Sequence, residues 1–287
     1  MNQQHGDRPG VEVVTDSTAD LPPYRAEREQ ITVVPLTIRF GDETFLDQVE
    51  LSAEGFLERL RTANELPKTS QPPVTAFESV FRQATDEGRD VVCVTIAAGL
   101  SGTYNAARLA AEAVASDRIH VIDSGSASMA TGWCAIAAAR AAREGKPLAE
   151  VAATAQAATG QYHLYAALET LEYLHKGGRI GRAGQLVGSM LGVKPVLTIA
   201  QGEVRPLERV RTWKRAYDRL VALGRSHGEL EGLAVMHVGR LDEANRLAES
   251  LSDLVANGDI VISDIGPVVA TYAGPGAIGV VTFSPPA

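Results

Sequence analysis

Apolar residues in the first half of the chain follow two alternating patterns. Short, nearly continuous apolar runs occur at residues 11–15, 90–96 and 118–122, and such runs are typical of strands buried on both faces. Between the first two, apolar residues recur every three or four positions from Val74 to Ala84, which places them on one face of a helix. The alternation predicts an α/β fold with a mostly parallel sheet and helices on both of its faces.

Residues 31–46 are rich in β-branched and aromatic side chains. We expect residues 31–40 to form one strand, followed by a turn at residues 41–43 and a return strand at residues 44–46. Ser52 has the residue type and position of an N-cap for the next helix. This part is therefore predicted as a hairpin followed by a helix.

The second half predicts a different arrangement of strands. Residues 193–199 and 204–210 flank Gln201-Gly202, which indicates a hairpin and therefore antiparallel pairing. An Ala-rich helix ends near Gly160, and we place a boundary there. The expected fold is α/β with two domains: an N-terminal, mostly parallel domain over residues 1–160, and a C-terminal mixed or antiparallel domain over residues 161–287.

Charge and composition limit the classes of function. The chain holds 27 Lys and Arg against 35 Asp and Glu, a formal net charge of −8. Broad nucleic-acid or anionic-membrane surfaces need clustered positive charge, so we expect neither partner. No apolar run approaches the ~20 residues of a membrane span, and the N-terminus lacks the pattern of a secretory signal. The prediction is a cytoplasmic protein with Cys93 and Cys134 as buried, reduced thiols.

Four clusters of small hydroxyl or acidic residues stand at predicted strand ends or helix starts. In open parallel sheets, ligands bind beyond the carboxyl ends of the strands, and donors at helix N-termini suit a small anion. The same residue types are also ordinary helix caps, and that interpretation stays open at this point. The four clusters are Asp16-Ser17-Thr18, Thr69-Ser70-Gln71-Pro72, Ser101-Gly102-Thr103 and Asp123-Ser124.

Ser101 also raises the alternative of a serine hydrolase. The segment 99–103 follows a predicted buried strand and opens a helix, as the nucleophile elbow of such enzymes does. Thr103 stands where that pattern requires glycine, and none of the histidines from His120 onward belongs to a recognisable triad motif. An esterase that uses Ser101 remains the alternative function.

Other candidate sites have a structural and a functional interpretation. Asp16 and Asp123 follow strands, where an aspartate caps the next helix more often than it binds a metal. The segment from His175 to Arg182 is a compact basic cluster, which suits either a solvated loop or a docking point for an anionic partner. Neither nucleotide-binding glycine motif is present, and no residue spacing proposes a metal or cofactor.

Several short blocks occur in a specific order along residues 11–283. They are Val14-Thr15-Asp16-Ser17-Thr18-Ala19-Asp20-Leu21-Pro22, Thr69-Ser70-Gln71-Pro72, Gly99-Leu100-Ser101-Gly102-Thr103-Tyr104, Asp123-Ser124, Leu171-Glu172-Tyr173-Leu174-His175-Lys176-Gly177-Gly178-Arg179-Ile180 and Gly274-Pro275-Gly276. Each block alone is a weak signal, but together and in this order they resemble the signature blocks of the DegV family of bacterial fatty-acid-binding proteins. The resemblance covers essentially the whole chain.

The resemblance implies a two-domain α/β protein that encloses one long-chain fatty acid between its domains. Family members called FakB present this acid to a separate ATP-dependent fatty acid kinase, which makes acyl-phosphate, so they are carriers and not enzymes. No cofactor is implied beyond the bound fatty acid. Thr69 and Ser101 match the family residues that hydrogen-bond the carboxyl group. The further candidates for this contact are Ser70, Gly102, Thr103 and Tyr272.

The resemblance also assigns a partner contact and contains one departure. Arg179 matches the family arginine implicated in work with the kinase, and Lys176 and Arg182 are further candidates beside it. Family members commonly carry a histidine two residues before Gly-Pro-Gly, where this chain has Tyr272. A tyrosine donates a hydrogen bond but does not become cationic near neutral pH. We therefore expect a changed carboxyl contact or a different ligand.

Overall fold

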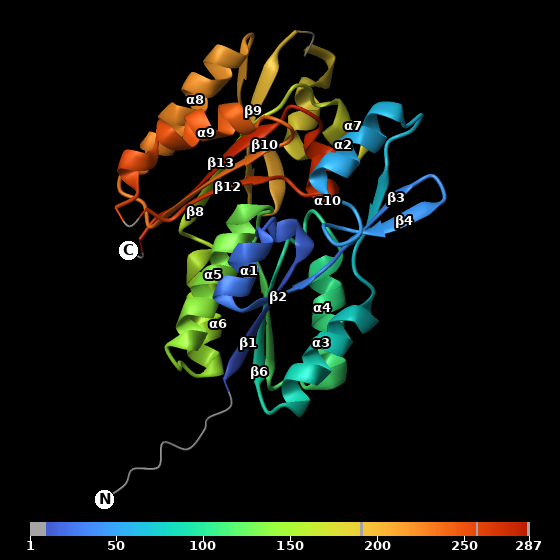
Figure 1. The fold of residues 1–287 in the computed structure, drawn as a ribbon, viewed down its shortest axis with the longest axis vertical. Helices are drawn as coiled ribbons and strands as arrows, with labels where there is room; N and C mark the ends of the chain where they lie inside the picture. Colours follow the sequence, from blue (N-terminus) through green and yellow to red (C-terminus); the bar gives the residue numbers. More distant parts are fainter. Residues whose placement is uncertain (1–9, 190–191, 257, 286–287) are drawn as a thin grey trace, which may run out of the picture.

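The computed structural model describes residues 10–189, 192–256 and 258–285, which form three sheets with helices between and around them (Figure 1). The first sheet contains four parallel strands in the order β2-β1-β6-β7. The strands are β1 Val11–Asp16, β2 Ile31–Val34, β6 Asp90–Thr95 and β7 Ile119–Asp123. The parallel sheet predicted for the first half is confirmed.

Helices cover both faces of this parallel sheet. Helices α3 and α4 pack on one face, in a core that contains Val14, and α5 and α6 pack on the other, in a core that contains Val13. Adjacent residues of a strand point to opposite faces, so Val13 and Val14 belong to different cores. The helix bounds are α1 Pro23–Glu29, α3 Val74–Asp86, α4 Thr103–Val114, α5 Met129–Arg143 and α6 Leu148–Ala158.

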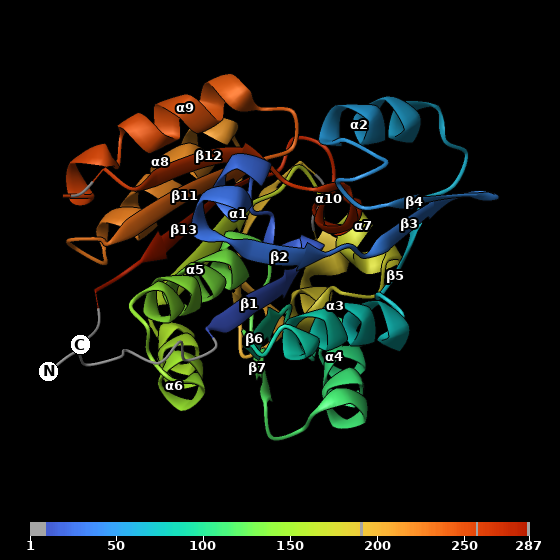
Figure 2. The ribbon, with the colours of Figure 1, turned by 60° about the horizontal axis from the view of Figure 1, so that its bottom comes forward.

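Residues 31–46 correct one prediction. The single strand expected over residues 31–40 is wrong, because β2 ends at Val34 and β3 begins at Thr37 in a different sheet. Pro35 has no N–H to donate to a strand ladder, which favours the break. β3 Thr37–Phe40 pairs with β4 Glu43–Leu46 and β5 Lys68–Ser70 in a small antiparallel sheet, beside which α2 Ala53–Thr62 lies (Figure 2).

Residues 161–285 contain a six-stranded sheet in the order β10-β9-β8-β13-β11-β12. Neighbouring strands are antiparallel except β11 and β12, so the predicted mixed sheet and the β9–β10 hairpin are confirmed. The elements are β8 Tyr162–Ala167, α7 Glu172–Lys176, β9 Lys194–Ala200, β10 Glu203–Val210, α8 Trp213–Arg225, β11 Gly232–His237, α9 Leu241–Glu249, β12 Ile260–Asp264, α10 Pro267–Ala273 and β13 Ile278–Phe283. Helices α8 and α9 cover one face of this sheet (Figure 1).

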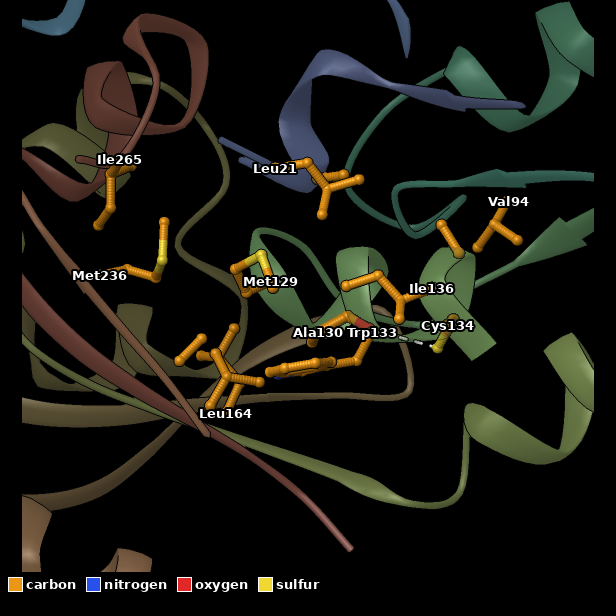
Figure 3. Packing of buried hydrophobic residues seen from close by; sticks show 14 of the residues in the cluster. Leu21, Val94, Met129, Ala130, Trp133, Cys134, Ile136, Leu164, Met236 and Ile265 are labelled. Carbon is orange, nitrogen blue, oxygen red and sulfur yellow. Dashed lines mark hydrogen bonds between the residues drawn. The ribbon is translucent and has the colours of Figure 1, made fainter. Parts of the chain in front are cut away.

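Helix α5 lies between the parallel sheet and the six-stranded sheet. Its side chains are buried nearly all round, and Trp133 stacks on Phe283 with ring centroids 5.6 Å apart. Figure 3 shows Leu21 and Leu164, from the two parts of the chain, on either side of this helix. One apolar core thus runs through both parts, and the division into two domains at residue 160 stays a prediction.

Two other predictions concern the cysteines and membrane spans. Cys93 and Cys134 are both free and buried, which confirms the expected buried thiols. Among the described residues, no helix is both long enough and apolar enough to cross a bilayer.

Candidate functional site

A cavity of about 470 Å³ lies between the six-stranded sheet and the N-terminal part of the chain. Its volume falls within the range of about 300–1,000 Å³ that small-molecule sites occupy. Strands β8, β9, β11 and β13 supply one wall, and α10 supplies another. The loops that follow β1, β6 and β7 close it, as expected for ligands that bind at the carboxyl ends of parallel strands.

The inner face of the six-stranded sheet gives the cavity an apolar floor. Leu197, Ala166, Gly279 and Met236 are register neighbours on four adjacent strands and form one row across this floor. The two middle residues have the smallest side chains, so the floor is hollowed between Leu197 and Met236. Met236 and Leu164, which also lines the cavity, are labelled in Figure 3. This surface suits an alkyl chain and offers it no charged group.

One end of the cavity is polar. Thr69 on β5 and Tyr272 on α10 both line it, and their hydroxyl groups share a hydrogen bond of 2.5 Å. One of the two hydroxyl protons closes this bond, and the other stays available to a ligand. Ser70 and Gln71 continue the same edge. The polar end therefore contains two neutral hydroxyl groups. A histidine at position 272 would instead place a titratable imidazole there.

Ser101 lines the same end from the loop that follows β6. Its hydroxyl shares a 2.9 Å hydrogen bond with the Thr103 hydroxyl and accepts the Thr103 N–H at 3.3 Å. Thr103 is buried in the first turn of α4 and contacts Ser101 there, without lining the cavity itself. Gly102 also lines the cavity, and a Cβ atom there would lie 1.8 Å from Oε1 of Gln71. A larger residue at position 102 would require the exposed Gln71 side chain to move away from this edge.

Arg179 lies at the rim of the polar end. Its guanidinium stands 5.2 Å from the centre of the Tyr272 ring, and it donates to the carbonyl oxygens of Leu100 at 3.3 Å and Gly177 at 2.9 Å. A Cβ atom on Gly177 would lie 2.5 Å from the Tyr272 ring, so this turn approaches the ring closely. The arginine expected at a partner contact is therefore also a lining residue of the cavity.

A surface hollow of about 750 Å³ adjoins the polar end and shares Thr69, Arg179 and Tyr272 with the cavity. Lys176 lines this hollow and forms an ion pair with Glu172 at 2.5 Å. Arg182 instead pairs with Glu203 at 2.9 Å on the surface. The basic cluster seen in the sequence is thus divided, with Lys176 and Arg179 near the hollow and Arg182 apart from it.

The two aspartates weighed as metal ligands have structural partners. Asp16 accepts the N–H groups of Thr18 at 2.9 Å and Ile96 at 2.8 Å, and burial raises the pKa of its carboxyl group. Asp123 accepts the N–H groups of Gly125 and Ala98. Both aspartates therefore stabilise turns at strand ends, as their cap interpretation predicts. In the ranges that the structure describes, no group of three or more His, Cys, Asp or Glu is arranged to hold a metal ion.

Three histidines of the described residues have side-chain partners other than Ser101. His163 and His227 stack with ring centroids 3.7 Å apart, and His237 lies 3.2 Å from Asp264. The hydroxyl of Ser101 is engaged with Thr103. In the part of the chain that the structure describes, no hydrogen bond joins Ser101 to a histidine, as the nucleophile of a triad requires.

Several lining residues escape prediction from sequence. Thr18 belongs to the predicted cluster Asp16-Ser17-Thr18 and lines the cavity with a hydroxyl group bonded to Asp16, but no motif indicates Ser128, which lines the cavity with a hydroxyl group bonded to Asp20. Ser128 has φ 55° and ψ −150°, a conformation that is costly for any residue with a side chain. The sheet residues of the floor depend on strand register, which no local motif encodes. A serine between Ala127 and Met129 has no sequence signal for its backbone conformation or for its place in the cavity.

These features define a class of protein: an α/β protein with an internal cavity that is apolar along its floor and lined by hydroxyl groups at one end. The family comparison agrees. A model of the DegV family, described as uncharacterised, matches residues 10–284. The chain therefore belongs to the DegV family.

Curated relatives cover nearly the whole chain. A DegV domain-containing protein of Streptomyces coelicolor is 39% identical, covering 96% of this chain and 98% of its own. The DegV protein of Bacillus subtilis is 32% identical, covering 94% and 98%. The match leaves no large part of either relative without a counterpart here.

Solved structures with the same fold are described as fatty-acid-binding proteins. The DegV family protein of Thermus thermophilus has a TM-score of 0.89 and 30% identity, covering 96% of this chain and all of its own. DegV of Bacillus subtilis has a TM-score of 0.85 and 31% identity, covering 96% and 99%. A stearic-acid-binding protein of Eubacterium ventriosum has a TM-score of 0.84 and 25% identity, covering 96% and 98%. These descriptions favour a lipid carrier over a hydrolase.

Proposed function

We propose that this protein binds one long-chain fatty acid in the cavity, with its carboxyl group at Thr69, Ser101 and Tyr272. The observation that carries the proposal is the contrast between the apolar floor over β8, β9, β11 and β13 and the hydroxyl-lined end at β5 and α10. Fatty-acid binding by the structural relatives supports it. The bound fatty acid is the ligand, and the proposal includes no cofactor.

The two parts of the cavity have different duties. Burial of about 14 methylenes at ~0.8 kcal/mol each supplies roughly 11 kcal/mol before the cost of immobilising the chain. The acyl chain therefore provides affinity. The hydroxyl groups satisfy the carboxyl group, which would otherwise cost several kcal/mol in an apolar setting or become protonated.

We further propose that the carboxyl group is presented to a separate fatty acid kinase, which phosphorylates it to acyl-phosphate. The hollow beside Thr69, Arg179 and Tyr272 gives such a partner access to the polar end. Arg179 and Lys176 are the proposed contacts nearest to it, and Arg182 is a more distant one. The cytoplasm is the proposed location of this exchange.

Calorimetric titration of delipidated protein with palmitate and oleate tests the binding. We expect one site per chain, and about tenfold weaker binding after Thr69→Ala or Ser101→Ala, since each removes a hydrogen bond to the carboxyl group. Thr154→Ala is the matched control, because Thr154 bonds only its own helix α6 on the surface. Heat changes that are absent for both acids would contradict the proposal.

Two further experiments address the kinase and the hydrolase. With a bacterial fatty acid kinase, Arg179→Ala should lower phosphorylation much more than it lowers lipid affinity, for which we expect a two- to threefold loss. If phosphorylation and lipid affinity fell by the same factor, Arg179 would have no separate role in contacting the kinase. Stoichiometric labelling by a fluorophosphonate probe that disappears in Ser101→Ala would instead favour the serine hydrolase.

A further inference from the structure

Helix α10 forms one wall of the cavity and is fixed to the N-terminal part of the chain at both ends. Val268 in its first turn and Tyr272 in its last turn both line the cavity. They are four residues apart, so they lie on the same face of the helix. Tyr272 shares its hydrogen bond with Thr69. Because α10 has only seven residues, a shift of its first turn also moves the Tyr272 hydroxyl.

Two buried aspartates hold the first turn of α10. Asp47 accepts the N–H of Val268 at 3.1 Å, and Asp20 accepts the N–H of Gly266 at 2.9 Å. Asp20 also accepts the hydroxyl of Ser128, which lines the cavity, at 2.6 Å. Both aspartates are only 1% exposed. The ligand wall is therefore held by carboxyl groups from residues more than 200 positions away.

Within the described ranges, the groups that bond these two carboxyl groups are neutral donors, and no cation contributes to their pKa values. Burial raises the pKa of Asp20 well above its usual range and that of Asp47 to about 6. The titratable groups that face Asp47 are Asp16 on β1 and Asp20 after it, and α10 adds only Tyr272 among the described residues. Oδ2 of Asp47 is buried without a hydrogen-bond partner in the described structure. An ionised carboxyl group that is buried without a cation destabilises the fold. A contribution to stability therefore does not explain why the chain has an aspartate at position 47.

We propose that Asp47, supported by Asp20, is a positioning residue for the carboxyl end of the cavity. By fixing the first turn of α10, it keeps Tyr272 at Thr69 and within reach of a bound carboxyl group. This inference rests on the proposed fatty-acid site. An ionised carboxylate accepts the Val268 N–H more strongly than a neutral group does. The negative charge of Asp47 therefore strengthens the bond that holds the first turn of α10.

A double-mutant cycle on oleate affinity tests the inference. We expect Asp47→Ala to raise Kd about tenfold at pH 7.5, as loss of one ligand hydrogen bond does. In a Tyr272→Phe background the same substitution should raise Kd no more than twofold, because the contact it positions is already lost. Equal losses in both backgrounds, or no loss in either, would overturn the proposal.

Asp259→Asn is the matched control, since Asp259 also joins the two parts of the chain but bonds Arg25 and Arg140 instead of α10. Its Kd should stay within twofold of wild type in both backgrounds. If wild-type protein takes up no oleate, the proposed function fails. If it takes up oleate but Asp47 is uncoupled from Tyr272, only the present inference fails.

Asp47→Asn gives a second measurement that holds even if Asp47→Ala does not fold. The amide keeps an oxygen for the Val268 N–H but does not ionise. The ratio of its Kd to that of wild type cancels the titration of the fatty acid itself. We expect a ratio of about 3 at pH 7.5 that falls to near 1 at pH 5, where wild-type Asp47 is protonated. A ratio that is constant over this range contradicts the proposal.

Discussion

Two polar networks join the two parts of the chain, and they hold their carboxyl groups by different means. Asp259 is bonded by Arg25 at 2.7 Å and Arg140 at 2.5 Å. Burial opposes its ionisation, but the two arginines outweigh burial and hold the pKa of Asp259 below its usual range. Asp20 and Asp47 are held by backbone amides and a hydroxyl group, and their pKa values are raised.

The difference follows the position of the ligand cavity. The arginine network consists of Arg25 in the first turn of α1, Arg140 in the last turn of α5 and Asp259 immediately before β12. Arg25 also stands 5.8 Å from the centre of the Trp133 ring. The neutral network lies behind α10, whose residues line the cavity. A cation behind α10 would offer the carboxylate of the ligand a second place to bind, whereas amide donors already engaged by aspartates do not. The buried ion pairs of Asp259 therefore lie away from the cavity, and the cation that lines the cavity, Arg179, stands at the rim of its polar end.

The largest effect is expected from breaking the arginine network. Arg25→Ala leaves Asp259 with one cation and should lower the free energy of unfolding by about 3 kcal/mol or more, as loss of one partner of a buried ion pair does. Urea unfolding measures it. Arg225→Ala, which breaks an exposed pair with Asp253, is the control and should leave the urea midpoint unchanged. Equal effects of the two substitutions would contradict the structural role of the buried network.

A second prediction concerns the pH dependence of stability, which should have opposite signs for the two networks. The pKa of Asp47 is about 6 in the folded protein against 3.8 when unfolded, so the wild-type protein loses stability between about pH 4 and pH 6, and the loss stays constant at higher pH. The stability of Asp47→Asn relative to wild type should therefore rise by up to about 3 kcal/mol from pH 4 to pH 6 and stay level above that range. The folded-state pKa of Asp259 is lowered below 3.8, so Asp259→Asn should lose stability relative to wild type as the pH rises toward about 4 and show a constant deficit above that pH. Unfolding curves at several pH values that move both variants in the same direction would contradict this account.

The smallest expected effect is on oleate affinity, when a titratable cation is added at the polar end of the cavity. Tyr272→His places an imidazole beside Thr69, and its protonation near pH 6.5 should favour a bound carboxylate. We expect the ratio of the variant Kd for oleate to the wild-type Kd to be a few-fold lower at pH 6 than at pH 8. Tyr272→Phe is the control, with a ratio that does not change over this range. A pH-independent ratio for Tyr272→His would place the carboxyl group elsewhere.

The sequence allowed much of the fold and part of the site to be predicted. Buried strands such as β6 and the hairpin at Gln201-Gly202 have strong local signals, and both are present. The break at Pro35 was missed because β-branched residues continue on both sides of it. Motif blocks led to Thr69, Ser101 and Arg179, which the fold brings to one end of the cavity.

The apolar floor and the aspartates behind α10 were beyond prediction for a physical reason. The row across Leu197, Ala166, Gly279 and Met236 exists only because four strands pair in a particular register. Asp47 becomes buried only because α10, more than 200 residues later, covers it. Both depend on contacts between distant segments, which hydrophobic periodicity does not encode.

The most direct test of the central claim is mass spectrometry of the lipid released when the purified protein is denatured. The account predicts one long-chain fatty acid for each chain, with length and unsaturation read from its mass, and a much lower occupancy in Thr69→Ala than in Thr154→Ala. A protein that releases no fatty acid, and that remains empty after incubation with oleate or palmitate, would contradict it.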